Sequence, residues 1–210
     1  MQSGSPSGEN ETVVLRPTSG IVLTVVTGVL AAVGLSSFVV RGDGLGVLRY
    51  GLLAVAVVYL AWLFFWYPRV SIDPSGVGVR NVLRTHHVTW PAIKAVETKY
   101  ALTIVTAHDK VVAWSAPAPS RYAALNNTGA DVRGTYARDN TSSVAVGDVP
   151  RSESGNAALH VRRAWTRLRD AGHLASGAIE GPEIRRTWNT GVIALSATLV
   201  VAGVALTVLV

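Results

Sequence analysis

The fold of this chain is decided by residues 70–96, which read VSIDPSGVGVRNVLRTHHVTWPAIKAV. Apolar and polar residues alternate on either side of Asp73-Pro74-Ser75-Gly76, a sequence typical of a tight turn. Alternation with period two is the pattern of a half-buried β-strand. The stretch therefore predicts a β-hairpin, then a third strand over residues 85–90 and a short helical turn that begins at Pro91.

Short runs of the same kind follow at residues 96–100, 102–106 and 111–114. With the earlier runs they make about six short strands at close spacing, which is typical of a small antiparallel barrel or sandwich. Val79 and Trp90 are predicted to lie in its core.

A helix is predicted over about residues 156–171, with Val161, Trp165 and Leu168 on one face. This helix would cap one end of the barrel, so the expected fold class of this segment is α+β, a small antiparallel barrel capped by a C-terminal helix. Its opposite face carries Arg162, Arg163, Arg167 and Arg169. That face is either a solvated surface or a contact for anionic lipid headgroups.

The same region resembles a known family. The motif is a strand that ends in Val79-Arg80-Asn81, a Leu83-Arg84 turn, and then Val88-x-Trp90-x-x-Ile93. Over about residues 69–116 the chain is similar to the bacterial pleckstrin-homology-like (PH-like) domain of actinobacterial membrane proteins, the low-molecular-weight protein antigen 6 type. The resemblance implies a membrane-associated PH-like fold, and it implies no biochemical activity.

Composition predicts membrane spans around this domain. Of the 210 residues 49% are hydrophobic and only 15% are charged, and the mean hydropathy of +0.34 is above that of most soluble domains. Residues 20–40, 50–67 and 191–210 contain no Asp, Glu, Lys, Arg or His. The first stretch is long enough to cross roughly 30 Å of hydrocarbon as a helix. A secretory signal peptide is the competing interpretation of the first stretch, but the preceding segment is not basic.

The glycine-rich residues 41–49 are predicted to turn the chain back, so that the first two spans form a hairpin. The second span closes with aromatic residues from Trp62 to Tyr67, typical of a membrane interface. Small residues recur every four positions and predict close helix packing, either within the chain or in a homo-oligomer or partner complex. They are Thr24, Gly28, Ala32 and Ser36 in the first span and Ala194, Thr198 and Ala202 in the third.

Arginines flank the central segment on both sides and set the expected orientation. Arg69, Arg80 and Arg84 follow the second span, and Arg185 and Arg186 precede the third. The positive-inside rule then places the central domain in the cytoplasm of a multi-pass protein of the cell membrane.

The predicted organisation has five parts. A disordered lead-in occupies residues 1–19, the hairpin of spans residues 20–67, and the PH-like domain residues 68–174. The Pro, Ser, Asn and Gly-rich residues 117–153 read as an insertion in that domain. A linker over residues 175–190 leads to the last span at residues 191–210.

Catalytic chemistry finds little support in the sequence. There is no cysteine, and no metalloprotease, serine-hydrolase or dinucleotide motif. His86 and His87 are adjacent on a predicted strand and so point to opposite faces. We therefore expect no enzyme activity, no metal and no cofactor. The net charge of +6 lacks the aromatic and basic interleaving of RNA-binding proteins, so no nucleic-acid partner is expected.

Two functional hypotheses remain. The first is a non-enzymatic membrane protein that presents a PH-like domain for docking or scaffolding of a protein partner, another membrane protein or a second copy of itself. The alternative is a module that senses anionic lipid headgroups. PH domains of eukaryotes hold phosphoinositides with basic residues in the loop between their first two strands, and the loop at residues 73–76 has none. The residues expected to bind a lipid or a partner are therefore elsewhere: Arg162, Arg163, Arg167, Arg169, Arg185 and Arg186.

Overall fold

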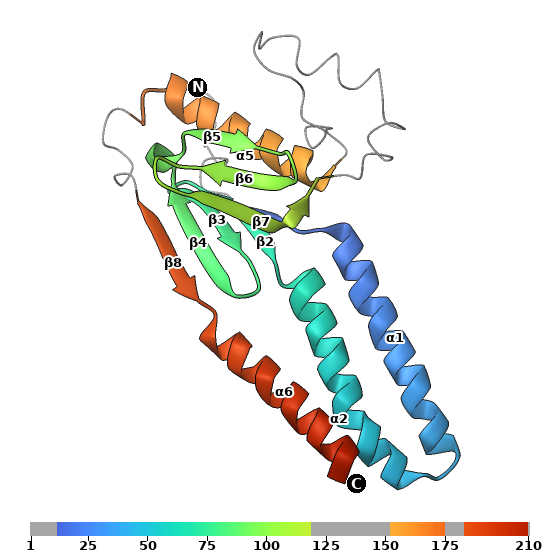
Figure 1. Ribbon diagram of the computed structural model, residues 1–210. Helices are drawn as coiled ribbons and strands as arrows, with labels where there is room; N and C mark the ends of the chain where they lie inside the picture. Colours follow the sequence, from blue (N-terminus) through green and yellow to red (C-terminus); the bar gives the residue numbers. More distant parts are fainter. Residues whose placement is uncertain (1–11, 119–151, 175–182, 210) are drawn as a thin grey trace, which may run out of the picture. The chain divides into compact units, whose positions relative to one another are not determined.

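The computed structural model describes residues 12–118, 152–174 and 183–209. The chain divides into two compact units, which are described separately (Figure 1). The β-rich unit comprises Met1–Leu15, Arg69–Asn81 and Thr85–Arg186, and the helical unit comprises Arg16–Pro68, Val82–Arg84 and Thr187–Val210.

One sheet of the β-rich unit has five strands in the order β1-β2-β3-β4-β8. They are β1 (Val13–Leu15), β2 (Arg69–Asp73), β3 (Gly76–Arg80), β4 (Arg84–Thr89) and β8 (Ile184–Trp188). The predicted hairpin is confirmed as β2 and β3, whose antiparallel register pairs Val70 with Val79 and Ile72 with Val77. These side chains point inward and, like Trp90, are almost completely buried.

The second sheet has three strands in the order β5-β6-β7, namely β5 (Ala95–Glu97), β6 (Ala101–Val105) and β7 (Lys110–Pro117). The antiparallel strands of the predicted barrel are present, but the barrel is not closed, because in the part of the chain that is described the two sheets are not joined strand to strand. The side chain of Asn81, which follows β3, forms hydrogen bonds with the free backbone edge of β7. Its Nδ2 donates to Val112 O at 2.8 Å, and its Oδ1 accepts from Trp114 N at 3.0 Å.

The predicted capping helix is α5 (Glu153–Asp170). It begins at Ser152, whose Oγ accepts a hydrogen bond from Gly155 N at 2.9 Å. Val161 is fully buried in the core, and Trp165 and Leu168 pack against it, as predicted. Helix α5 therefore contributes its apolar face to the same core as the two sheets (Figure 1).

Two strands lie where no regular structure was predicted. Strand β1 falls in the expected disordered lead-in and pairs with β2, Val13 opposite Ile72. Strand β8 falls in the expected linker over residues 175–190 and pairs with β4. Both corrections have one cause: β2 and β4 each offer a free row of backbone donors and acceptors, and short neighbouring segments satisfy them.

Three helices of the helical unit are long and apolar enough to cross a membrane. They are α1 (Thr18–Val40), α2 (Gly44–Ala61) continued by a π-helical turn (Trp62–Trp66), and α6 (Thr190–Leu209). Helix α2 packs on both α1 and α6 and lies between them (Figure 1). The first and third predicted spans agree with α1 and α6 to within about two residues, the usual uncertainty of helix ends.

The connection between α1 and α2 is shorter than predicted. Helix α2 begins at Gly44 rather than Tyr50, because Asp43 caps it: its Oδ1 accepts from Gly46 N at 2.8 Å. Gly42 makes the reversal with a φ of 68°. As a consequence Arg49, assigned to the loop by the sequence, lies within α2, and its Nε donates to Thr207 O near the end of α6 at 3.0 Å.

The predicted small-residue ladders follow the helix contacts only in part: Thr24 of α1 is buried and its Oγ1 lies 3.4 Å from Ala61 O of α2, whereas other members are uncovered. Gly28 has open space where a Cβ would lie, and Ala194 and Thr198 are exposed. The close approach of α2 and α6 is instead at Gly203, where a Cβ would lie 3.2 Å from Leu53 Cα. Oligomer formation through the ladders stays a prediction.

Candidate functional site

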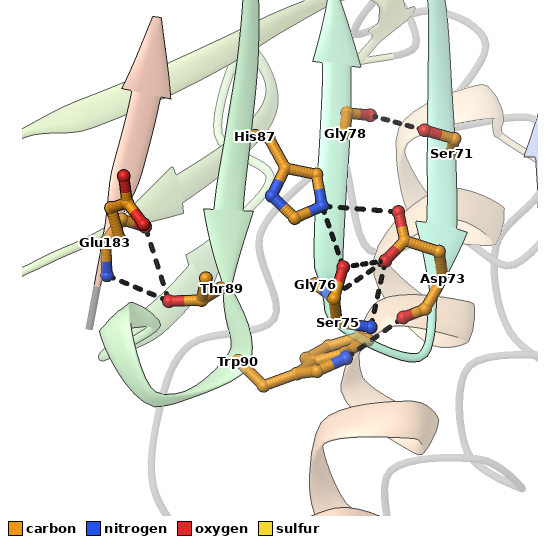
Figure 2. A network of polar contacts seen from close by, with 9 residues as sticks. All are labelled: Ser71, Asp73, Ser75, Gly76, Gly78, His87, Thr89, Trp90 and Glu183. Atoms are coloured by element: carbon orange, nitrogen blue, oxygen red, sulfur yellow. Dashed lines mark hydrogen bonds and ion pairs between the residues drawn. The ribbon is translucent and has the colours of Figure 1, made fainter. Parts of the chain in front are cut away.

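The turn between β2 and β3 carries a dense polar network (Figure 2). Asp73 Oδ1 accepts from the backbone N–H groups of Ser75 at 2.9 Å and Gly76 at 3.0 Å. This is the Asx-turn geometry expected of an aspartate at the first position of a turn. The backbone oxygen of Asp73 accepts from the indole Nε1 of Trp90 at 3.1 Å, which joins the turn to the buried core.

His87 reaches this turn from β4. Its Nε2 lies 3.3 Å from Asp73 Oδ2 and 3.2 Å from Ser75 Oγ (Figure 2). In a catalytic triad, one ring nitrogen of the histidine is hydrogen-bonded to the carboxylate and the other accepts the proton of the hydroxyl. Here the same nitrogen faces both groups, so the arrangement holds the turn against β4 and does not activate Ser75.

His86 and His87 lie on opposite faces of β4, as predicted. In the register with β3, His86 pairs with Val79 on the inward face, whereas His87 pairs with Gly78 on the outward face. A Cβ at Gly78 would overlap Ser71 Oγ, so the small residue keeps the adjacent strands in register.

Glu183 adds a second carboxylate next to this network. Its backbone N–H donates to Thr89 Oγ1 at 2.9 Å (Figure 2). The pKa of Glu183 is lowered from its ordinary value of 4.5, chiefly because Arg185 Nε donates a hydrogen bond to Oε1 at 2.9 Å. Burial opposes this effect, and the charge of Arg185 and the neighbouring His87 add to it. Each of the two carboxylates at this end of the sheet thus has a basic side chain beside it.

The basic residues predicted to bind a lipid or a partner do not form one free surface. Arg162 Nη2 donates to Val96 O of β5 at 2.8 Å, which makes it part of the packing of α5. Arg169 pairs with Asp170, Arg185 with Glu183 and Arg186 with Asp109. Arg163 and Arg167 are exposed and lie four residues apart on one side of α5.

Sequence reasoning missed an exposed apolar pair on β7. Val111 and Ala113 are buried, whereas Val112 is 41% and Trp114 is 52% exposed. The register with β6 places Val112 opposite Thr103 on this outer face. The signal was present in the sequence, because residues 111–114 are apolar without alternation and one face of such a strand must stay uncovered or meet a partner.

Comparison with known proteins agrees with this fold. Residues 67–125 match the model of a bacterial PH domain, which contains β2 to β7. No curated protein and no solved structure is significantly similar to the chain. A bacterial PH domain is thus present, joined at its beginning to α2 and followed later in the chain by α6. The actinobacterial, antigen 6 part of the resemblance stays a prediction.

Proposed function

We propose that this protein is a non-enzymatic integral membrane protein whose PH domain docks a protein partner at the cytoplasmic face of the cell membrane. The observation that carries the proposal is the exposed pair Val112 and Trp114 on the outer face of β7. Tryptophan is the residue most enriched among the side chains that dominate binding energy at protein interfaces. An exposed aromatic beside an aliphatic neighbour is therefore a better anchor for a protein than for a soluble ion.

The attachment of the domain supports a partner that is itself in the membrane. The PH domain follows α2 directly and precedes α6, so helices long enough to span a bilayer tether it at both ends. Tethering raises the effective concentration of any membrane partner, and a modest interface then suffices.

The polar network at the β2–β3 turn favours a binding module over an enzyme. His87 faces Asp73 and Ser75 through a single nitrogen. Within residues 12–118, 152–174 and 183–209, no three His, Asp or Glu side chains gather as they would around a metal ion. These side chains are explained by the turn that they hold.

Photo-crosslinking in native membranes tests the proposal. A photoreactive amino acid at Val112 should give an adduct with another protein, and Trp114→Ala should reduce its yield because the neighbouring anchor is lost. The matched control is the same photoreactive residue at Arg163, which is exposed on α5. Adducts of equal yield from both positions, or none from Val112, would contradict docking through β7.

The lipid-sensing alternative retains one favourable observation, the exposed pair Arg163 and Arg167 on α5. Each such residue near an anionic surface contributes about 1 kcal/mol. Capture of lipid rather than protein by the photoreactive residue at position 163, lost when Arg167→Gln is added, would favour this alternative. The pairing of Arg162 with Val96 makes the basic face smaller than the sequence indicates.

A further inference from the structure

The tip between β3 and β4 belongs to the helical unit. Asn189, which precedes α6, binds this tip twice: its N–H donates to Leu83 O at 3.0 Å and its Nδ2 donates to Val82 O at 3.1 Å. Val82 is buried, whereas Leu83 is 46% exposed. The tip and the start of α6 therefore form one local structure, with an apolar side chain at its surface.

Arg84 and Trp188 meet on this structure. The guanidinium carbon of Arg84 lies 3.7 Å from the centre of the Trp188 ring, and the ring is 56% exposed. Stacking occupies the flat face of a guanidinium and leaves the N–H donors at its edge available. Among the described residues the side chain of Arg84 makes no hydrogen bond and no ion pair, unlike those of Arg49 and Arg162, which donate to backbone oxygens.

The packing of α2 on α6 locates this pair along the helices. Arg49 of α2 contacts Thr207 of α6, and Leu53 approaches Gly203. The two helices are therefore antiparallel, and each step of four residues toward the end of α2 corresponds to a step of four residues toward the start of α6. The same register, continued, brings Trp66 about level with Thr190, where α6 begins. Trp188 is then at the level of the aromatic residues that close α2, and aromatic side chains of spanning helices gather at the membrane interface.

We propose that Arg84 and Trp188 form a binding site for the phosphate of an anionic membrane lipid, a site distinct from the protein-docking face on β7. The Arg84 edge donates to the phosphate oxygens, a geometry that a guanidinium satisfies with two parallel hydrogen bonds. The Trp188 ring and Leu83 lie against the glycerol and upper acyl carbons of the same lipid. Two exposed apolar side chains beside the arginine favour a lipid over a soluble phosphate, which would leave them in water.

Lipid retention by the full-length protein tests this site. The protein, purified in detergent and titrated with phosphatidylglycerol, should keep lipid molecules that native mass spectrometry can count. Arg84→Gln should weaken retention of one phosphatidylglycerol about fivefold, the equivalent of about 1 kcal/mol per basic residue at an anionic surface. Lys94→Gln is the matched control, because Lys94 is also exposed, has no part in either lipid-binding hypothesis, and its replacement changes the net charge by the same amount.

A second variant guards against a folding defect. Trp188→Phe keeps an aromatic face for Arg84 and should retain the lipid within about twofold, whereas Trp188→Ala should lose it. Retention unchanged in Arg84→Gln, or lowered equally in Lys94→Gln, would overturn the proposal. Displacement of the lipid by millimolar inorganic phosphate alone would also overturn it, because it would show a site for soluble anions.

Discussion

The β-rich unit and the helical unit place the same residue type in opposite surroundings. Val70, Val77 and Val79 of the β-rich unit are completely buried, whereas Val22 and Val201 of the helical unit are 59% and 68% exposed. Burial of a valine side chain is worth roughly 1.5–3 kcal/mol in water. The first unit obtains this energy from its own core. The second unit does not, which supports a hydrocarbon environment for its three long apolar helices.

Polar groups show the same contrast. In the β-rich unit the Asp73 network lies at the surface, where water reaches His87 and Asp73. In the helical unit Arg49 binds Thr207 O, and Thr24 Oγ1 donates to Gly20 O at 2.9 Å. Backbone oxygens accept from these donors, as expected for a helix in hydrocarbon, which offers no hydrogen-bond acceptor. The two units therefore differ in how they bury apolar side chains and in how they satisfy polar groups, and substitutions can test both differences.

The largest effect is expected in the core of the β-rich unit. Trp90 is 1% exposed, and Trp90→Ala should lower the free energy of unfolding of this unit by about 3–5 kcal/mol, because it removes packed side-chain volume. Trp114→Ala is the control, since the same residue type is 52% exposed there and should change stability by less than about 1 kcal/mol. Denaturant titration of both variants measures the difference, and equal losses would contradict the assigned core.

The next effect concerns the bridge between the two sheets. Asn81→Ala leaves Val112 O and Trp114 N of β7 without their partner, at a cost of up to about 1–3 kcal/mol for each of these part-buried groups. Amide hydrogen exchange of residues 110–117 should become faster, while the exchange rates of β2 and β3 should stay unchanged. Ser71→Ala is a mild comparison, because its Oγ makes only a 3.5 Å contact with Gly78 O. Unchanged exchange in β7 would show that the bridge is dispensable.

In the helical unit the contact between α2 and α6 can be broken at Gly203. Gly203→Val would bring a side chain against the backbone of Leu53 and should destabilise the unit by about 1–3 kcal/mol. Gly28→Val meets open space and should change stability by less than about 0.5 kcal/mol. Thermal unfolding in detergent compares the two, and an equal loss in both would place the close approach elsewhere.

The smallest effect is expected at Glu183, on the exposed surface. Because the folded protein lowers its pKa, the ionised carboxylate contributes stability above the ordinary value of 4.5, and this contribution is lost as the pH falls through the lowered pKa. Glu183→Gln should therefore flatten the stability profile slightly below pH 4.5. Arg185→Gln should have the same effect, and the double variant should add nothing to either, as expected for a single shared interaction.

Local signals in the sequence were sufficient for much of this fold. The charge-free runs gave the three helices, and the turn at Asp73 with its flanking alternation gave β2 and β3. The glycine-rich residues 41–49 predict a loop and so conceal the start of α2, although Asp43 is a typical helix-capping residue. Strands β1 and β8 could not be predicted, since each forms only by pairing with a strand far away in the sequence.

The basic residues illustrate the limit at the functional site. Arg162 and Arg163 are neighbours and look equivalent in the sequence, yet only the first reaches Val96 O across the β-rich unit. The stacking of Arg84 on Trp188 likewise joins residues that only the folded chain brings together. Spacing along a helix predicts which side chains share a face, but it carries no information on a partner from another element.

Accessibility of single cysteines in cells tests most directly whether hydrocarbon surrounds the helical unit, and the absence of native cysteine makes the measurement clean. Leu30 and Tyr100 are both well exposed, at 66% and 79%. Thiol labelling requires water and the thiolate form. With a membrane-impermeant maleimide, Gly44→Cys should label on intact cells, Tyr100→Cys only after permeabilisation, and Leu30→Cys in neither state. Labelling of Leu30→Cys as fast as Tyr100→Cys in permeabilised cells would contradict a helical unit embedded in lipid.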